Sequence, residues 1–208
     1  MSEKFRRNRF AVSPEGRRIE QERIEHLQAN APKGFMYVPK LGMYVTEGLV
    51  ARGENWDNQK RISREEGGRV EMITEFKKVA IYTKENRPEI YNQIMGQNGL
   101  QGERFYAEFD KEDGEFYIIT PNGIEKVHKR NLIEDRVLGI SLDSWLNDNS
   151  KQGLPHKKID SGKLNFWSPK EGAVARFYAD PFRSGLGCEG HPLYSNSFLG
   201  VRVVREAA

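Results

Sequence analysis

The chain has 208 residues, enough for one domain with a substantial core, and 37% of them are apolar while 30% are charged. A formal net charge of +3 is too small to indicate a polyanionic partner by itself. The N-terminus has no apolar signal-peptide region and no run of about 18 apolar residues occurs, so we expect neither a signal peptide nor a membrane span. One cysteine, Cys188, excludes an internal disulfide and favours an intracellular or virion-associated protein.

The first 31 residues are charged and contain few core residues, which indicates an N-terminal extension ahead of a domain at 32–208. Ser13 and Pro14 are a typical cap and first position for a helix that continues over 17–28. Basic and aromatic residues alternate upstream, as in some nucleic-acid-binding segments, although a solvated, frayed terminus is what we expect. These residues are Lys4, Phe5, Arg6, Arg7, Arg9 and Phe10.

The first part of the domain is predicted to contain two short strands followed by three helices. Apolar alternation around a turn at 39–42 predicts the strands, and helical spacing flanked by proline or glycine predicts the helices. The strands are 35–39 and 41–46, and the helices are 56–66, 72–84 and 88–95. Gly67 and Gly68 end the first of these helices, because glycine adopts the positive φ of a helix end.

The second half is predicted to be mostly β-structure with long irregular connections. Residues 105–109 and 115–119 flank the sequence Asp-Lys-Glu-Asp-Gly, which is a strong hairpin signal, and 124–127 predicts a further strand. Between 136 and 167 we expect irregular segments anchored by Trp145 and Trp167. Large aromatic residues in such a region usually fill core positions, and Trp167 is a candidate exception because it is close to the C-terminal segment.

The C-terminal segment differs from the rest of the chain in the residue types it contains. Glu, Lys, Gln, Met and Trp fill about three in ten positions before Gly172, so roughly ten are expected between Gly172 and Val204. Glu189 is the one that occurs. Residues 175–179 and 198–204 predict strands, and the roughly eighteen residues between them form a predicted loop that is too long for an ordinary hairpin.

The five residue types that are scarce in this segment, Glu, Lys, Gln, Met and Trp, share a genetic property: none of them is encoded by a codon that ends in a pyrimidine. The residue types that fill the segment can all be encoded that way. A loop rich in glycine, serine and proline, in which lysine and glutamate happen to be scarce, is the simpler alternative. The strands on either side favour a functional loop.

Two motifs carry a resemblance to known proteins. Residues 199–205, Leu-Gly-Val-Arg-Val-Val-Arg, resemble the closing strand of C-type-lectin-like domains in the formylglycine-generating-enzyme group. A longer pattern comprises Val-Ala-Arg-Phe-Tyr-Ala at 174–179, Leu-Gly-Cys at 186–188, Pro192, Ser195 and Leu-Gly-Val-Arg at 199–202. It resembles the variable proteins of archaeal diversity-generating retroelements.

The resemblance implies an α+β, C-type-lectin-like domain with two or three helices in its first half, small antiparallel sheets and a loop-rich second half. It also implies that an error-prone reverse transcriptase copies a template repeat, substituting at adenines, and that the copy replaces the 3′ end of the gene. Such copying leaves codons that end in a pyrimidine. Glu189 departs from this pattern, and we expect it to be fixed or to come from a different template codon.

In such a protein a fixed scaffold presents variable side chains, so the resemblance implies selective association with a protein or other surface ligand, without catalysis or a cofactor. The candidate ligand-binding residues are Tyr178, Asp180, Phe182, Arg183, Ser184, Gly185, Gly187, Glu189, Gly190, His191, Leu193, Tyr194, Asn196, Ser197 and Phe198, with Trp167 as a supporting residue. The expected scaffold residues are Arg176, Phe177, Leu186, Pro192, Leu199, Val201 and Val203. A monomer is the favoured oligomeric state.

Two other classes of function stay open. A formylglycine-generating-like enzyme would use a pair of cysteines, whereas Cys188 has no partner and is expected to be small buried filler. A nucleic-acid-binding protein would use the basic N-terminus and lose affinity steeply with salt. No metal site is expected, because the histidines lack ligand spacing and no calcium-binding triplet occurs. The histidines are His26, His128, His156 and His191.

Overall fold

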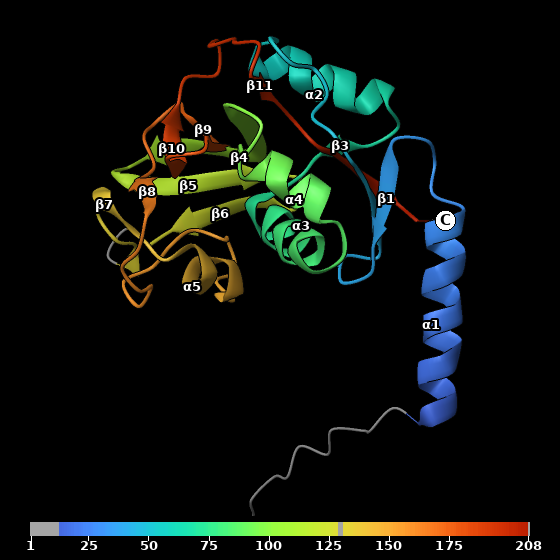
Figure 1. The fold of residues 1–208 in the computed structure, drawn as a ribbon. Helices are drawn as coiled ribbons and strands as arrows, with labels where there is room; N and C mark the ends of the chain where they lie inside the picture. Colours follow the sequence, from blue (N-terminus) through green and yellow to red (C-terminus); the bar gives the residue numbers. More distant parts are fainter. Residues whose placement is uncertain (1–12, 129–130, 208) are drawn as a thin grey trace, which may run out of the picture.

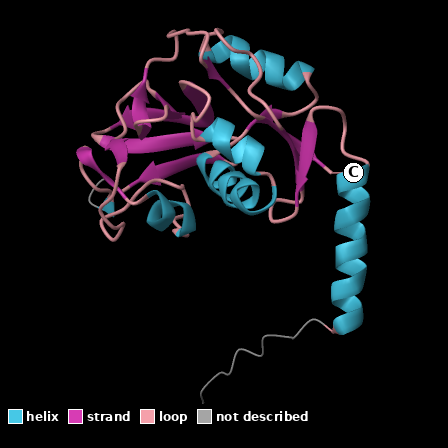
Figure 2. Ribbon diagram, in the orientation of Figure 1, coloured by secondary structure: helices cyan, strands magenta, loops and turns pink. Residues whose placement is uncertain are grey.

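The structure is a computed structural model that describes residues 13–128 and 131–207. These residues form a mixed α/β fold with five helices and two mostly antiparallel sheets (Figure 1). Figure 2 shows the helices outside the sheets, with the longest one projecting from the body. Within the described residues, no helix combines the length and apolar character needed to cross a membrane. The basic cluster at residues 4–10 lies outside the described part.

The helices predicted in the first half are confirmed, each within a few residues of its predicted bounds. They are α1 (Pro14–Ala29), α2 (Trp56–Glu65), α3 (Ile73–Asn86) and α4 (Pro88–Ile94). The Ser13 hydroxyl caps α1 by accepting a hydrogen bond from the amide of Gly16 at 3.0 Å. Gly67 follows α2 with φ +76°, as expected for the glycine after a helix.

The smaller sheet has the strand order β1-β2-β12-β3 and joins the two ends of the domain. Its strands are β1 (Phe35–Val38), β2 (Met43–Thr46), β3 (Arg69–Val70) and β12 (Val203–Glu206). The last turn of α1 docks beside it, because Leu27 packs against Tyr37 and Tyr44. The Tyr44 hydroxyl donates a hydrogen bond to the Leu27 carbonyl at 3.2 Å. The end of the N-terminal extension is therefore part of the packed domain.

The larger sheet has the strand order β6-β5-β4-β9-β10-β8-β7, with β11 paired to β4. Its strands are β4 (Gln101–Glu112), β5 (Glu115–Thr120), β6 (Gly123–Val127), β7 (Arg136–Ile140), β8 (Leu164–Trp167), β9 (Val174–Ala179), β10 (Ser184–Gly190) and β11 (Leu199–Gly200). The predicted hairpin is confirmed as β4 and β5, and the predicted strand at 124–127 as β6. The C-terminal segment supplies β9, β10 and β11, so much of it lies within the sheet.

An aromatic cluster packs α3 and α5 (Leu142–Asn147) onto the larger sheet. The Phe76 ring of α3 lies 4.9 Å from the rings of Phe105 and Phe177, between centroids. Trp145 of α5 stacks on Phe177 at 6.3 Å, and its indole N–H donates to the Gly153 carbonyl at 2.7 Å. Trp145 and Phe177 are both buried, as expected for core residues.

The prediction of irregular structure over 136–167 is wrong in part, because this stretch contains β7, α5 and β8. These elements have four to six residues each. So few residues show less than two turns of a helix or two or three repeats of a strand, which leaves too little periodicity to recognise.

The prediction of one closing strand over 198–204 is also wrong. β11 pairs in parallel with β4 of the larger sheet, Val201 bridges to Val50, and β12 pairs with β2 and β3 of the smaller sheet. Between these pairings, buried Arg202 forms an ion pair with Glu103 of β4. The chain changes sheets at this point, so a single uninterrupted ladder cannot form.

The prediction of one long loop between residues 179 and 198 is wrong as well, because β10 occupies its centre. Gly185, Gly187 and Gly190 are buried in this strand. A β-carbon on Gly185 would lie 2.5 Å from the Tyr178 ring, and one on Gly190 would lie 2.6 Å from the Val174 carbonyl oxygen. Glycine is therefore needed here for close approach between strands, whereas the sequence suggested loop flexibility.

Candidate ligand-binding surface

The turn between β9 and β10 is organised by Asp180. Its carboxylate accepts hydrogen bonds from the amides of Phe182 and Arg183 at 2.9 and 3.0 Å, and it pairs with the Arg183 guanidinium at 3.1 Å. The hydrogen bond from the Phe182 amide is the main reason that the pKa of Asp180 lies below its usual value. The turn leaves the Phe182 side chain 96% exposed at its tip.

The segment from His191 to Leu199 forms no strand before β11 begins at Leu199. Residues elsewhere in the domain nevertheless donate hydrogen bonds to its backbone carbonyls. The amide of Trp56 donates to the Pro192 carbonyl at 2.9 Å, and the amide of Gly53 donates to the Asn196 and Leu199 carbonyls at 3.1 Å each. The amide of Gly102 donates to the Phe198 carbonyl at 2.9 Å. These contacts involve main-chain atoms only, so they do not depend on which side chains the segment carries.

Arg104 of β4 also donates hydrogen bonds to backbone carbonyls of the same segment. Its guanidinium donates to the carbonyls of Tyr194 and, at 3.5 Å, His191. It also donates to the Glu54 carbonyl at 3.1 Å and to the Gln59 side-chain oxygen at 2.9 Å. Burial, with a smaller effect from nearby Arg176, lowers the pKa of Arg104 to about 10, so it remains charged at neutral pH.

A pocket of ≈ 240 Å³ opens between β9, the β9–β10 turn and this segment. It is lined by Leu100, Arg176, Tyr178, Arg183, Tyr194, Phe198 and Leu199. The Tyr178 ring packs against Trp167 at 5.9 Å between centroids. The Arg176 guanidinium lies 6.0 Å from the centroid of the Tyr194 ring. Aromatic surfaces beside guanidinium groups suit apolar and hydrogen-bonding contacts with another protein.

The candidate residues divide by exposure into three sets. Those with exposed side chains are Phe182, Arg183, His191, Leu193, Tyr194 and Ser197. Those that are partly buried are Tyr178, Asp180, Ser184, Glu189, Asn196 and Phe198, with Trp167 beside them. The buried ones are Gly185, Gly187 and Gly190, which have no side chain to present and belong with the scaffold.

Exposed apolar side chains gather around this surface. Six large apolar side chains of the described residues are exposed, and four of them lie in or beside the C-terminal segment. Phe182 is 96% exposed, Leu193 68%, Tyr194 42% and Leu100 39%. Leu100 and Tyr194 line the pocket. Neighbouring exposed apolar side chains are typical of an interaction site, whereas single scattered ones are ordinary.

Glu189 has a structural partner. Its carboxylate pairs across the strands with Arg176 at 3.1 Å, and both side chains are mostly buried, at 19% and 25% exposure. A β-carbon on Gly187 would lie 2.6 Å from the same carboxylate. The residue that departs from the composition of the segment therefore supports the sheet and contributes little to the exposed surface.

The expected scaffold residues are mostly buried. Phe177, Leu186, Leu199, Val201 and Val203 are each 2% exposed or less, whereas Arg176 and Pro192 are partly buried. Cys188 is fully buried too, as expected for small filler, and burial is the main reason that its pKa is raised well above the ordinary value. A buried thiol of this kind is a poor nucleophile.

Leu100 and Arg104 belong to this surface although no sequence pattern indicates either of them. Leu100 precedes β4, and only the fold shows that it lines the pocket. Arg104 lies in a run of four buried residues, 102–105, where strand alternation would turn every second side chain to solvent. In the described part of the chain, no group of three His, Cys, Asp or Glu side chains is arranged to hold a metal ion. Comparison with known protein families, curated proteins and solved structures finds no match.

Proposed function

We propose that this protein is a non-catalytic binding protein that uses the exposed side chains of its C-terminal segment to associate with a protein or other surface ligand. We further propose that the segment over 174–204 is diversified by adenine-directed copying from a template repeat, on a C-type-lectin-like scaffold. An intracellular or virion-associated location and a monomeric state belong to the same proposal.

The observation that carries the proposal is the separation of backbone support from side-chain display. Donors at residues 53–59 and 102–104 hold the carbonyls of six residues between His191 and Leu199. These contacts can persist when the side chains of the segment change, because they involve only its main-chain carbonyls. Restricted residue types combined with such support are what a diversified binding surface requires.

Glu189 supports the same proposal. Among the five rare residue types, it alone occurs in the segment, and its carboxylate is engaged with Arg176 within the sheet. We therefore place it among the fixed residues, together with the three buried glycines. The proposed display set is then the six residues with exposed side chains, centred on Phe182, Leu193 and Tyr194.

A pair of libraries tests this proposal without requiring the natural ligand. The first randomises the six exposed positions, and the second randomises six exposed positions along the projecting helix α1. The α1 positions are Arg17, Arg18, Glu20, Gln21, Glu22 and Arg23. Each library is displayed on yeast, sorted for protease-resistant members, and then selected against purified lysozyme as a model target.

We expect both libraries to keep most members folded, and specific binders to emerge only from the first, because only that surface combines a pocket with exposed aromatic side chains. The proposal is contradicted if members of the first library lose protease resistance as often as a library of the buried positions 177, 186, 188 and 199. It is also contradicted if the α1 library yields binders equally often.

A further inference from the structure

A second, larger cleft of ≈ 990 Å³ lies away from the C-terminal segment. It is bounded by the end of β6, by residues near 131 and 132, and by the loop over 148–158. Its lining includes Lys126, Lys151, Lys157 and Lys158. Leu132 and Leu154, which are 9% and 1% exposed, supply apolar lining. A volume of this size is typical of sites for small molecules.

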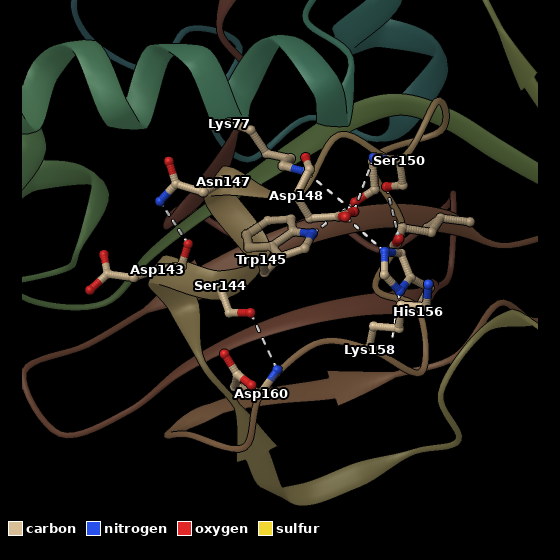
Figure 3. Close-up of polar contacts among 12 residues, drawn as sticks. Lys77, Asp143, Ser144, Trp145, Asn147, Asp148, Ser150, His156, Lys158 and Asp160 are labelled. Carbon is tan, nitrogen blue, oxygen red and sulfur yellow. Dashed lines mark hydrogen bonds and ion pairs between the residues drawn. The ribbon is translucent and has the colours of Figure 1, made fainter. Parts of the chain in front are cut away.

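The loop over 148–158 is held in one conformation by its polar contacts (Figure 3). The Asp148 carboxylate accepts hydrogen bonds from the Ser150 amide at 3.0 Å and from His156 Nε2 at 2.7 Å. The Ser150 hydroxyl donates to the Leu154 carbonyl at 3.1 Å, and Lys77 Nζ donates to the Asp148 carbonyl. Burial alone would raise the pKa of Asp148, but the hydrogen bonds from Ser150 and His156 lower it overall, so it is ionised at neutral pH.

His156 positions this loop and has no free ring nitrogen for chemistry. Its Nδ1 accepts a hydrogen bond from the Lys158 amide at 3.2 Å, which assigns the proton to the Nε2 that faces Asp148 (Figure 3). Both nitrogens are therefore engaged within the protein. The loop that contributes Lys151, Lys157 and Lys158 to the cleft lining is therefore held by its own hydrogen bonds.

The charge of the cleft lining is mostly positive. Its two carboxylates are already paired, Glu125 with Lys151 at 2.9 Å and Asp148 with His156 at 2.7 Å. The pair of Lys126 with Glu115, at 3.0 Å, is exposed on both sides and is therefore weak. Lys157 and Lys158 are exposed and have no acidic partner among the residues that the structure describes.

From this arrangement we infer that the cleft binds a small organic phosphate. The ammonium groups of Lys157 and Lys158, unpaired among the described residues, with the paired ones of Lys126 and Lys151 nearby in the lining, match a group that carries several negative charges, and a phosphate carries about −1.5 to −2 at pH 7. Leu132 and Leu154 provide a surface for the less polar part of the molecule. This site is separate from the proposed display surface and does not depend on it.

Isothermal titration calorimetry of the full chain tests the inference, with inorganic tripolyphosphate and adenosine triphosphate as probes and no divalent cation present. The test variant is K157A/K158A, and the matched control is K33A/K40A, which removes the same charge from exposed lysines at the two ends of β1. All four lysines are exposed, so both variants are expected to fold, which circular dichroism checks.

We expect one binding site, adenosine triphosphate binding at least as tightly as tripolyphosphate, and a loss of at least tenfold in affinity in K157A/K158A. The control is expected to change affinity less than twofold. The inference is overturned if neither probe shows saturable binding at millimolar concentration, or if the control loses as much affinity as the test variant. Binding of a 20-nucleotide single-stranded DNA, with neither small probe binding, would also overturn it.

Discussion

Replacing Arg104 by methionine should loosen the binding surface while leaving its exposed side chains in place. Methionine fills much of the same volume but cannot donate hydrogen bonds. The carbonyls of His191, Tyr194 and Glu54 and the side-chain oxygen of Gln59 would each lose a donor. Arg104 is only 1% exposed, so water cannot easily replace it.

The expected loss of stability in R104M follows from two opposing effects. A hydrogen bond from a charged donor contributes about 1.5–3 kcal/mol to stability, and Arg104 makes several of them. The substitution also removes a buried charge whose desolvation costs several kcal/mol, which offsets part of the loss. We expect R104M to lower the free energy of unfolding by about 3 kcal/mol. The effect should be concentrated in the segment from His191 to Leu199, because Arg104 contacts its backbone.

Chemical denaturation and hydrogen exchange measure these two effects. In R104M, peptides covering 191–199 should exchange much faster, while peptides covering α3 should change little. The matched control is R52M, because Arg52 is exposed and donates to the Gln101 side chain at 2.6 Å. The control should cost less than about 1 kcal/mol. Equal stability of R104M and R52M, with unchanged exchange over 191–199, would show that Arg104 does not hold this backbone.

Three further predictions concern single residues. By thermal or chemical unfolding, F182A should change stability by less than about 0.5 kcal/mol because the side chain is exposed, whereas Y178A should cost about 2 kcal/mol because its ring packs on Trp167. Cys188 should resist a thiol-reactive disulfide reagent in the folded protein and react on addition of guanidinium; rapid reaction without denaturant would show an accessible thiol. Because the pKa of Asp148 is lowered in the folded protein, its carboxylate stabilises the fold above the unfolded pKa of about 3.9, and this stabilisation is lost as pH falls through the folded pKa. D148N should therefore be less stable than the unsubstituted protein at pH 7, and the difference in their free energies of unfolding should narrow below about pH 4. A gap that widened towards low pH would contradict the last prediction.

The helices and the β4–β5 hairpin could be predicted because they are long or have strong end signals. Helix α3 repeats its apolar residues over 14 positions, and α1 begins at the Ser13 cap. The elements that escaped prediction are short or depend on distant partners. β10 is not recognisable as a strand, because glycine in a strand and glycine in a loop look alike in a sequence. The close approach of the Tyr178 ring to Gly185 and of the Val174 carbonyl to Gly190 is visible only in the fold.

Composition alone indicates where the candidate surface lies in the chain. Which of its residues are exposed and which support the backbone is visible only in the structure. Composition separated the C-terminal segment from the rest of the chain, and the resemblance named the expected display residues. Neither could show that Asp180 shapes a turn, that Glu189 pairs with Arg176, or that Arg104 holds the backbone. Those roles depend on contacts between residues far apart in the sequence. The cleft that we propose to bind a phosphate likewise combines β6 with the loop over 148–158, and no local motif indicates it.

Sequencing the DNA that flanks the gene tests whether the C-terminal segment is diversified from a template repeat. The proposal predicts a near-identical copy of the segment encoding residues 174–204, close to a reverse-transcriptase gene. The copy should differ from the gene only where it carries adenine, and these positions should fall mainly in the codons of the exposed residues, such as Phe182, Leu193 and Tyr194. The absence of such a repeat, or differences spread equally over the codons of buried residues such as Phe177 and Leu186, would contradict diversification of this surface.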